Sequence, residues 1–322
     1  QAEILTAQFP GAYVVWNMLG ASRAQIGMLD EALHALNKSI SLKPDYADAH
    51  YNKGYALYYL DRLNEAIEAY RRTILLKPDY AEAYSNMGVA LKNQGKFDEA
   101  IEVINKSILL KPHDAEAYSN LGVALKDQGK LDEAIEAHKK SILLKPFRAE
   151  AYNNIGNALK EQGRLDQALE NYNKAISLKP DYAEPYNNIG LVLHYLDKSY
   201  EAIETFNKSI SLKPDFAEAH QNLSLTLLNS GRLKEGLEQY EWRWKTPQFL
   251  TNERIFMQPM WDGSQSLKDK RILLWHEQGI GDTLNWSSCL SLLASQAKHC
   301  ILECQDKLVP LLQRSFPNVE VK

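Results

Sequence analysis

The dipeptide Lys-Pro recurs along the chain at a constant interval, and this interval constrains the fold more than any other feature. It occurs at 43–44, 77–78, 111–112, 145–146, 179–180 and 213–214, so each step is 34 residues. Self-similarity at a fixed period of this length is typical of proteins that stack copies of one supersecondary unit. With the proline taken as position 32, seven repeats fit between Tyr13 and about Leu250.

Each repeat predicts two helices joined by a turn. In the third repeat, an apolar face has the i, i+3, i+4, i+7 spacing of a first helix. The face comprises Tyr84, Met87, Gly88 and Leu91. The residue after that helix is one that tolerates a left-handed conformation: Gly27, Asp61, Gly95, Gly129, Gly163, Asp197 and Gly231. Small residues that permit close crossing recur on the second helix, which the proline then ends: Ala32, Ala66, Ala100, Ala134, Ala168 and Ala202.

Acidic residues flank the start of most first helices. Four pairs resemble capping boxes in which Asp replaces Ser or Thr: Asp45/Asp48, Asp79/Glu82, Asp181/Glu184 and Asp215/Glu218. The second member belongs to a row at position 2: Asp48, Glu82, Glu116, Glu150, Glu184 and Glu218. Two interpretations stay open for this row, helix capping and a ligand-facing surface. A shorter row at position 12, Lys92, Lys126 and Lys160, fits a solvated face.

The segment AEAYSNMGVALKNQGKFDEAIEVINKSILLKP resembles a tetratricopeptide repeat, and the resemblance covers residues 13–250. It implies a right-handed superhelix of about seven helical hairpins, with the first helix of each pair on the concave face. A single repeat cannot bury its own apolar face, so stability is expected to come from stacking. The Lys and Arg clamp with which chaperone adaptors of this family hold a carboxylate is absent from positions 2 and 6.

An amide recurs at position 6 in six of the seven repeats: Asn52, Asn86, Asn120, Asn154, Asn188 and Asn222, with Met18 in the first. An Asn side chain offers a donor and an acceptor side by side, which matches a peptide unit. The row resembles the asparagine ladder of the O-linked N-acetylglucosamine transferase repeats. We therefore expect an extended peptide or protein as partner, bound in the groove with little regard to its sequence. Shared ancestry or local bonding between helices are the alternatives.

Composition excludes several other classes of protein. The net charge is −4 with both signs mixed along the chain, which argues against a nucleic-acid-binding face. No apolar run reaches the roughly 18 residues of a membrane span. The three cysteines, Cys289, Cys300 and Cys304, are expected to be buried thiols in a reducing compartment, which favours a cytoplasmic location. Too few ligands accompany them for zinc, so no metal site is predicted.

The seventh repeat departs from the pattern. Gly236 replaces the small alanine, and YEWRWKTPQF replaces the Lys-Pro ending. We expect Trp242 and Trp244 to pack the end of the array onto the next domain, since terminal repeats are commonly atypical. The predicted organisation is a segment 1–12, seven repeats over 13–250, a connector 251–270 and a partial α/β domain 271–322.

That last domain is predicted from strands alternating with helices, a pattern typical of a parallel sheet. RILLW, CILEC and VEV are the expected strands, and 284–297 and 306–314 the expected helices. The turn after the first strand holds Gly279, Gly281 and Asp282. It is not the dinucleotide fingerprint, because Leu284 takes the place of the third glycine.

RILLWHEQGIGDTLNW followed by ILECQDKLVPLL resembles the opening of glycosyltransferase family 9, the heptosyltransferase-like enzymes of GT-B fold, over 261–322. The resemblance implies a bacterial fusion in which Asp282 is the catalytic base and Gly279 and Gly281 belong to the substrate loop. The other interpretation of Asp282 is a cap for a helix that begins near Thr283. His276 and Glu277 are the alternative bases.

The resemblance also implies a nucleotide-sugar donor held by a second Rossmann-like half that these residues lack, so this chain alone is expected to be inactive. The predicted function is a peptide-binding scaffold that presents an acceptor to a fused glycosyltransferase. The alternative is a non-enzymatic scaffold whose α/β segment is a structural cap.

Overall fold

The computed structural model describes residues 2–246, 256–276 and 280–322; for residues 2, 3, 281 and 282 it describes the backbone alone. The chain divides into two compact bodies, Gln1–Asn252 and Glu253–Lys322. The first body holds the repeat array, and the second is called the C-terminal body here. No helix in the described residues has the length and apolarity needed to cross a membrane.

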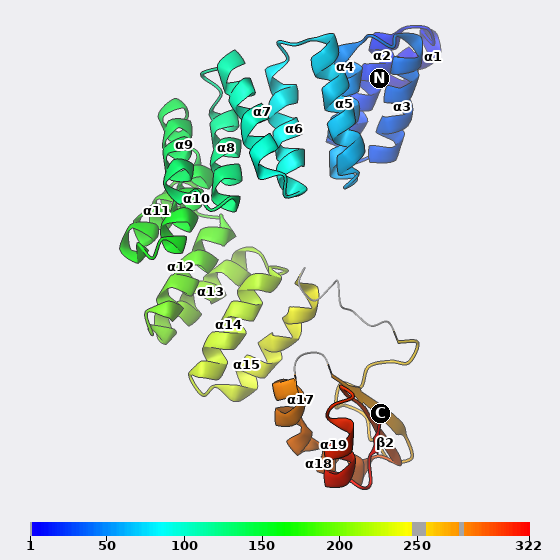
Figure 1. The fold of residues 1–322 in the computed structure, drawn as a ribbon, viewed down its shortest axis with the longest axis vertical. Coiled ribbons are helices and arrows are strands. Elements are labelled where there is room, and N and C mark those ends of the chain that lie inside the picture. Colours follow the sequence, from blue (N-terminus) through cyan, green and yellow to red (C-terminus); the bar gives the residue numbers. More distant parts are fainter. Residues whose placement is uncertain (1, 247–255, 277–279) are drawn as a thin grey trace. The chain divides into compact units, whose positions relative to one another are not determined.

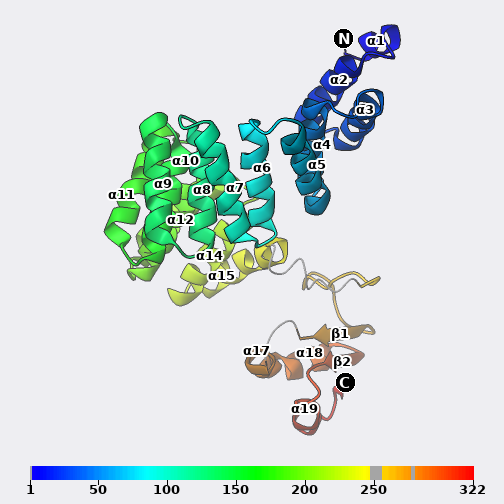
Figure 2. The ribbon, with the colours of Figure 1, turned by 45° about the horizontal axis from the view of Figure 1, so that its top comes forward.

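The array is built from helix pairs that follow one another in chain order (Figures 1 and 2). The pairs are α2 (Tyr13–Gln25) with α3 (Leu29–Leu42), α4 (Ala47–Tyr59) with α5 (Leu63–Leu76), α6 (Ala81–Asn93) with α7 (Phe97–Leu110), α8 (Ala115–Asp127) with α9 (Leu131–Leu144), α10 (Ala149–Glu161) with α11 (Leu165–Leu178), α12 (Ala183–Tyr195) with α13 (Ser199–Leu212), and α14 (Ala217–Asn229) with α15 (Leu233–Tyr240). Helix α1 (Ala2–Gln8) precedes them, and the 3₁₀ helix η1 (Glu241–Lys245) follows. The predicted superhelix of seven hairpins is confirmed.

The turn inside each hairpin requires the left-handed conformation that the sequence predicted. Gly95 has φ +76°, and the two aspartates that replace glycine at this place, Asp61 and Asp197, have φ 58° and 57°. Asp tolerates this region better than most non-glycine residues. The turn geometry is thus the same whether glycine or aspartate occupies it.

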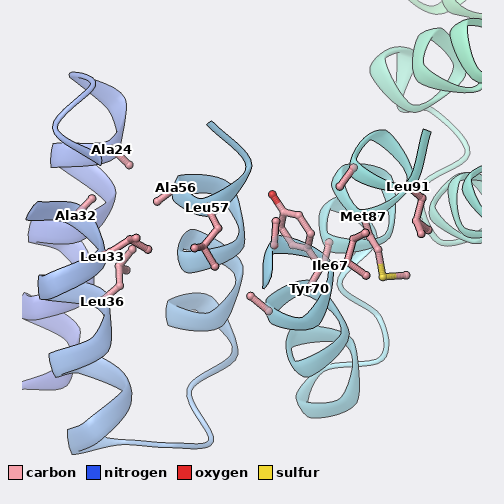
Figure 3. Packing of buried hydrophobic residues seen from close by; sticks show 14 of the residues in the cluster. Ala24, Ala32, Leu33, Leu36, Ala56, Leu57, Ile67, Tyr70, Met87 and Leu91 are labelled. Atoms are coloured by element: carbon pink, nitrogen blue, oxygen red, sulfur yellow. The ribbon is translucent and has the colours of Figure 1, made fainter. Parts of the chain in front are cut away.

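Close contact within each hairpin depends on a missing side chain. A Cβ built on Gly88 would lie 2.3 Å from Cγ1 of Ile104, and one on Gly156 would lie 2.5 Å from Cε1 of Tyr172. The alanines at position 20 are fully buried in the six repeats that carry them. Because these residues are small, the two helices of a hairpin approach closely. Larger side chains of consecutive repeats, such as Leu36, Tyr70 and Met87, form one core cluster (Figure 3).

The predicted capping boxes are wrong. The N-cap residues are Tyr46, Tyr80, Tyr182 and Phe216, each one residue after the expected aspartate, and none makes a side-chain cap bond. The turn after the proline includes the aspartate, so the aspartate lies one position too early to cap. The fourth repeat has no aromatic there, and Asp114 accepts from the backbone N–H of Glu116 at 2.9 Å.

The first helices lie on the inner side of the curved array. Those of consecutive repeats contact one another from α2 to α14, whereas consecutive second helices have no comparable contact within the described array. The elements that approach more closely in a curved stack lie on the smaller radius. The inner face of the array is therefore the first-helix face, and the second helices form the outer face.

The C-terminal body contains a parallel sheet in the order β1 (Arg271–Trp275), β2 (His299–Glu303), β3 (Glu320–Val321). Its helices are α17 (Ile280–Trp286), the 3₁₀ helix η2 (Ser287–Cys289), α18 (Leu290–Gln296) and α19 (Val309–Ser315). The predicted parallel sheet is confirmed. The first helix begins at Ile280, earlier than the expected start near Thr283, and η2 divides it from α18. Cys300 and Cys304 are buried free thiols as predicted, but Cys289 is exposed.

Candidate functional site

The position-6 amides all lie on first helices, and each is half-buried. They form a row along the inner face, one per repeat from the second to the seventh. Met18 occupies the equivalent place in the first repeat and is 56% exposed. The row is called the amide row below.

Five members of the amide row bond to the preceding repeat. In each pair the Nδ2 group donates to a side-chain oxygen 35 residues earlier, at position 5. The pairs are Asn52 to Asn17 Oδ1 at 2.9 Å, Asn86 to Tyr51 Oη at 2.9 Å, Asn120 to Ser85 Oγ at 3.1 Å, Asn188 to Asn153 Oδ1 at 3.0 Å, and Asn222 to Asn187 Oδ1 at 3.0 Å. Local bonding between first helices, one of the alternatives raised from the sequence, is therefore confirmed.

These local bonds leave part of each amide available. A carboxamide has two N–H donors and an acceptor with two lone pairs, and the local bond uses a single donor. Within the described residues, no donor bonds the Oδ1 atom of any member of the row. Asn154 is the exception to the pattern, since its side chain makes no hydrogen bond to the described residues.

The acceptors at position 5 differ in residue type, so the sequence does not single them out. Repeats one to six all carry a side-chain oxygen there: Asn17, Tyr51, Ser85, Ser119, Asn153 and Asn187. Five of them are buried, at 5–8% exposure, and Tyr51 is half-buried. The common property is an acceptor facing the next repeat, a signal that residue identity alone conceals.

Tyrosines surround the amide row in the second and third repeats. Tyr51 stacks on Tyr80 with ring centroids 4.9 Å apart, and Tyr55 packs against Tyr59 at 4.7 Å. Burial raises the pKa of Tyr51, so its hydroxyl stays protonated while Asn86 donates to it. This end of the inner face is thus aromatic as well as amide-lined.

The lysines at position 12 form a charged row beside the amides. Lys92 lies 3.8 Å from Asp127, and Lys126 lies 2.9 Å from Asp127 and 3.5 Å from Glu161. Burial lowers the pKa of Lys126, but Asp127 and Glu161 outweigh it and leave that pKa raised. The solvated face expected for this row is wrong for these two lysines, whose side chains are 22% and 26% exposed.

The acids at position 2 pair with lysines at position 31 of their own repeat where such pairs form. Glu82 bonds Lys111, and Glu150 lies 3.8 Å from Lys179. These side chains are 43–51% exposed. Exposed ion pairs contribute little to stability, about 0–1 kcal/mol.

Two hollows of about 360 and 450 Å³ open between second helices. They are lined by α9, α10 and α11, and by α7, α8 and α9, through packing-face residues such as Ile155 and Leu125. No member of the amide row lines either hollow. The hollows therefore belong to the outer face and not to the amide row.

The loop after β1 lies partly outside the described residues. Glu277 and Gly279 fall there, and Gly281 and Asp282 are described as backbone within α17, with nothing said of their side chains. His276 is half-buried, its backbone N–H donates to the carbonyl of Glu303, and its Nδ1 lies 3.4 Å from the same oxygen. Asp282 is the third residue of α17, so it is not the N-cap of a helix starting near Thr283. The described residues contain no group of His, Cys, Asp or Glu that could hold a metal.

Trp242 closes the seventh repeat itself. Its ring stacks on His220 of α14 with centroids 3.8 Å apart and planes within 2°. The ammonium of Lys245 lies over the Trp242 ring, 3.9 Å from the ring centroid. The contacts described for Trp242 thus lie within α14 and η1, and its expected packing onto the next domain stays a prediction.

Comparison with known families identifies the repeats. A model described as "TPR repeat" matches residues 20–61, 54–95 and 156–197, and models described as "Tetratricopeptide repeat" match 79–144 and 183–216. Together they cover 20–144 and 156–216, more than half of the chain. The chain belongs to the tetratricopeptide repeat family, and its array is a helical-repeat scaffold for protein interaction.

Individual relatives share only part of their length with this chain. Protein FlbA of Caulobacter vibrioides is 34% identical over 96 residues, which is 28% of this chain and 16% of FlbA. The structure of the APC/C hetero-tetramer Cut9-Hcn1 has a TM-score of 0.62 at 22% identity, covering 70% of this chain and 45% of that one. Pseudomonas aeruginosa PilF has a TM-score of 0.55 at 20% identity, covering 64% and 94%. At these identities the two structures show a shared fold alone.

Proposed function

We propose that the array binds an extended segment of a partner polypeptide along its inner face, through the amide row. The observation that carries the proposal is the state of these amides. Each is half-buried, and in five of them the local bond fixes the side chain while leaving Oδ1 and one N–H unused. A peptide backbone presents one N–H and one C=O per residue, which complement those two groups. Contacts of this kind select an extended backbone more than a sequence.

Fixing the side chain matters for affinity. An Asn that is already held in one rotamer loses less conformational entropy on binding than a freely rotating one. A row of pre-positioned amides spaced by one repeat can therefore hold a peptide that has no structure of its own. Each backbone bond formed in this way would contribute about 0.5–1.5 kcal/mol.

The test separates the local role of the amides from the ligand role. A display library of unstructured 12-residue peptides is panned on residues 1–322, and the affinity of a selected peptide is measured by calorimetry. Variant one carries Asn120→Ala, Asn188→Ala and Asn222→Ala. Variant two carries Ser85→Ala, Asn153→Ala and Asn187→Ala, which breaks the same three local bonds but leaves the amides in place.

We expect variant one to bind at least tenfold more weakly. Variant two should lose thermal stability but no more than about threefold in affinity, because its amides remain and only their fixed rotamer is lost. Equal losses in the two variants would assign the row a structural role and refute the proposal. Helicity measured by circular dichroism confirms that both variants are folded.

We further propose that the C-terminal body belongs to a glycosyltransferase that acts on the segment held by the array. The supporting observation is the three-stranded parallel sheet, in which Asp282 follows β1. In open parallel sheets, ligands bind at the carboxyl ends of the strands. The donor would be a nucleotide sugar. Asp282 would take the proton of an acceptor hydroxyl as the new glycosidic bond forms and the nucleotide leaves.

The measurement is sugar transfer by the natural full-length protein with Asp282→Asn, which keeps the shape of the side chain and removes the base. A positioned base typically contributes about 10²–10⁴-fold. A loss of at least a hundredfold with an unchanged melting temperature supports the proposal. Near-normal transfer would favour the other candidate, an α/β body with a structural role alone.

A further inference from the structure

The 35-residue offset that joins the amide row to position 5 recurs two turns further along the first helices, in three pairs of neighbouring repeats. There it joins position 12 of one repeat to position 13 of the next. Asn93 donates to the Tyr58 hydroxyl at 2.9 Å, Lys92 faces Asp127, and Lys126 faces Glu161. Repeat geometry therefore places residue 195 opposite Lys160, in the same relation.

Residue 195 is a tyrosine, so the pattern of lysine facing acid ends at the seam between α10 and α12. Tyr195 is 63% exposed and offers no negative charge. Glu161, the acid next to Lys160 in sequence, is already paired with Lys126. Asp127 and Glu161 thus pair with Lys92 and Lys126, and Lys160 is left without an ion pair among the described residues.

The ammonium of Lys160 is partly removed from water, and nearby carboxylates offset this burial only in part. Lys160 is half-buried, and burial lowers the pKa of its side chain. Lys126 acts in the same direction, and Glu161 and Glu218 act against it without reversing the shift. In Lys126, which is less buried and has two carboxylates, the effect of burial on the pKa is outweighed. A partly desolvated cation gains most from a carboxylate supplied from outside.

The same helix carries the other irregularity of the inner face. Asn154, the amide without a local bond, is six residues before Lys160 on α10, about 9 Å along the helix axis. Its two N–H donors and its oxygen are all free of bonds to described residues. Helix α10 is therefore where the inner face offers both an unpaired cation and an unused amide.

We propose that the seam between α10 and α12 binds an Asp or Glu side chain of the partner segment through the ammonium of Lys160, while Asn154 on the same helix stays available to the peptide backbone. This inference rests on the proposed peptide-binding function and deepens it, because it adds a requirement for one acidic residue. It also explains how a peptide can bind in one register, although the amide row itself would accept any peptide backbone. The charge-assisted bond is stronger than the neutral bonds of the row.

The test begins with the same peptide library, displayed with its C-termini fused so that no terminal carboxylate is present. It is panned in parallel on the wild-type chain, on Lys160→Met and on Lys174→Met, a charge-matched control on the exposed face of α11. We expect Asp and Glu to be enriched at one peptide position on wild type and on Lys174→Met, and not on Lys160→Met.

A selected peptide with a blocked C-terminus is then compared with its Glu→Gln form. Lys160→Met should weaken the Glu peptide at least tenfold and the Gln peptide less than twofold. Tyr195→Glu supplies the missing acid within the chain, so it should also weaken the Glu peptide at least fivefold. Because it adds an ion pair at the seam, it should not lower the melting temperature.

The outcomes separate the two claims. If peptides bind the amide row but show no acidic preference, or if the Glu and Gln forms respond equally to Lys160→Met, the inference is wrong and the proposed function stands. If Tyr195→Glu leaves the affinity for the Glu peptide unchanged, the carboxylate lies elsewhere and the inference is wrong. If no peptide is enriched on the wild-type chain, both are overturned.

Discussion

His138 is a buried polar residue at a place where the other repeats are apolar or aromatic. His138 is at position 24 of its repeat and packs over Gly122. Other repeats carry Leu36, Tyr70, Ile104, Tyr172 and Phe206 at this position, each against its own first helix. His138 is 1% exposed, and neither ring nitrogen has a hydrogen-bond partner. An unsatisfied buried polar group costs about 1–3 kcal/mol. His138→Phe, which reproduces the sixth repeat, is therefore expected to stabilise the array by about 1–2 kcal/mol at pH 7.5.

The pH dependence supplies a second, larger signal. Burial, with a smaller effect of Arg148 and Lys126, lowers the pKa of His138 from 6.5 to about 4. Between those values the unfolded chain binds the proton and the folded chain does not, so stability rises with pH through this window. The contribution of the neutral His138 to stability is fully present above pH 6.5 and is lost as the pH falls toward 4. From pH 7.5 to pH 5 the loss is about 2 kcal/mol of a total near 3 kcal/mol.

The assay is hydrogen–deuterium exchange of the α8 and α9 amides at both pH values, with urea unfolding as a global check. Local exchange suits an array in which each repeat contacts only its neighbours. The wild-type chain should lose protection in α8 and α9 at pH 5 relative to the His138→Phe variant, after correction for intrinsic exchange rates. His50, whose pKa burial also lowers, is present in both chains and cancels in the comparison. Identical pH dependence in the two chains, or a variant less stable at pH 7.5, would refute the reasoning.

Three further substitutions test the packing and turn arguments. Gly88→Ala places a Cβ 2.3 Å from Ile104 and should cost about 1–3 kcal/mol in urea unfolding, whereas Gly11→Ala, with open space around it, should be near neutral. Gly95→Ala should cost about 1 kcal/mol because of its φ of +76°, and Gly95→Asp should cost less, since Asp61 adopts the same conformation; equal costs would count against the turn argument. Trp242→Ala removes the stack on His220, so amide exchange in α14 should accelerate at least tenfold with α4 unchanged; uniform exchange would show that the stack does not hold the array end.

Periodicity predicted the parts of the fold that repeat. The 34-residue interval fixed the helix pairs, and the residue after each first helix identified the left-handed turns, including those at Asp61 and Asp197. Capping failed for a geometric reason. The turn after each proline takes up one more residue than the capping-box pattern assumes. An aromatic residue such as Tyr80 is therefore the N-cap, and the aspartate before it lies outside the helix.

The candidate site was predictable in its donors but not in their partners. The recurring Asn at position 6 stands out, whereas position 5 alternates among Asn, Tyr and Ser and hides a shared acceptor. A partner 35 residues away becomes evident only when adjacent repeats are aligned with an offset of one position. The C-terminal helix start at Ile280 was missed because two glycines lie near it, and glycine commonly argues for a turn.

The two offset rows differ in how they respond to a change in repeat number. Removing one whole repeat would rejoin an acceptor at position 5 with an Asn at position 6, so the amide row tolerates gain or loss of a copy. The charged row does not share this tolerance, because its lysines and acids are confined to three repeats. Deleting residues 149–182, for example, would remove Lys160 and Glu161 and set Lys126 opposite Tyr195, so that Lys126 would keep only its contact with Asp127. The number of repeats can thus change without altering the amide row that would hold a peptide backbone. The unpaired Lys160, in contrast, distinguishes the fifth repeat from the others.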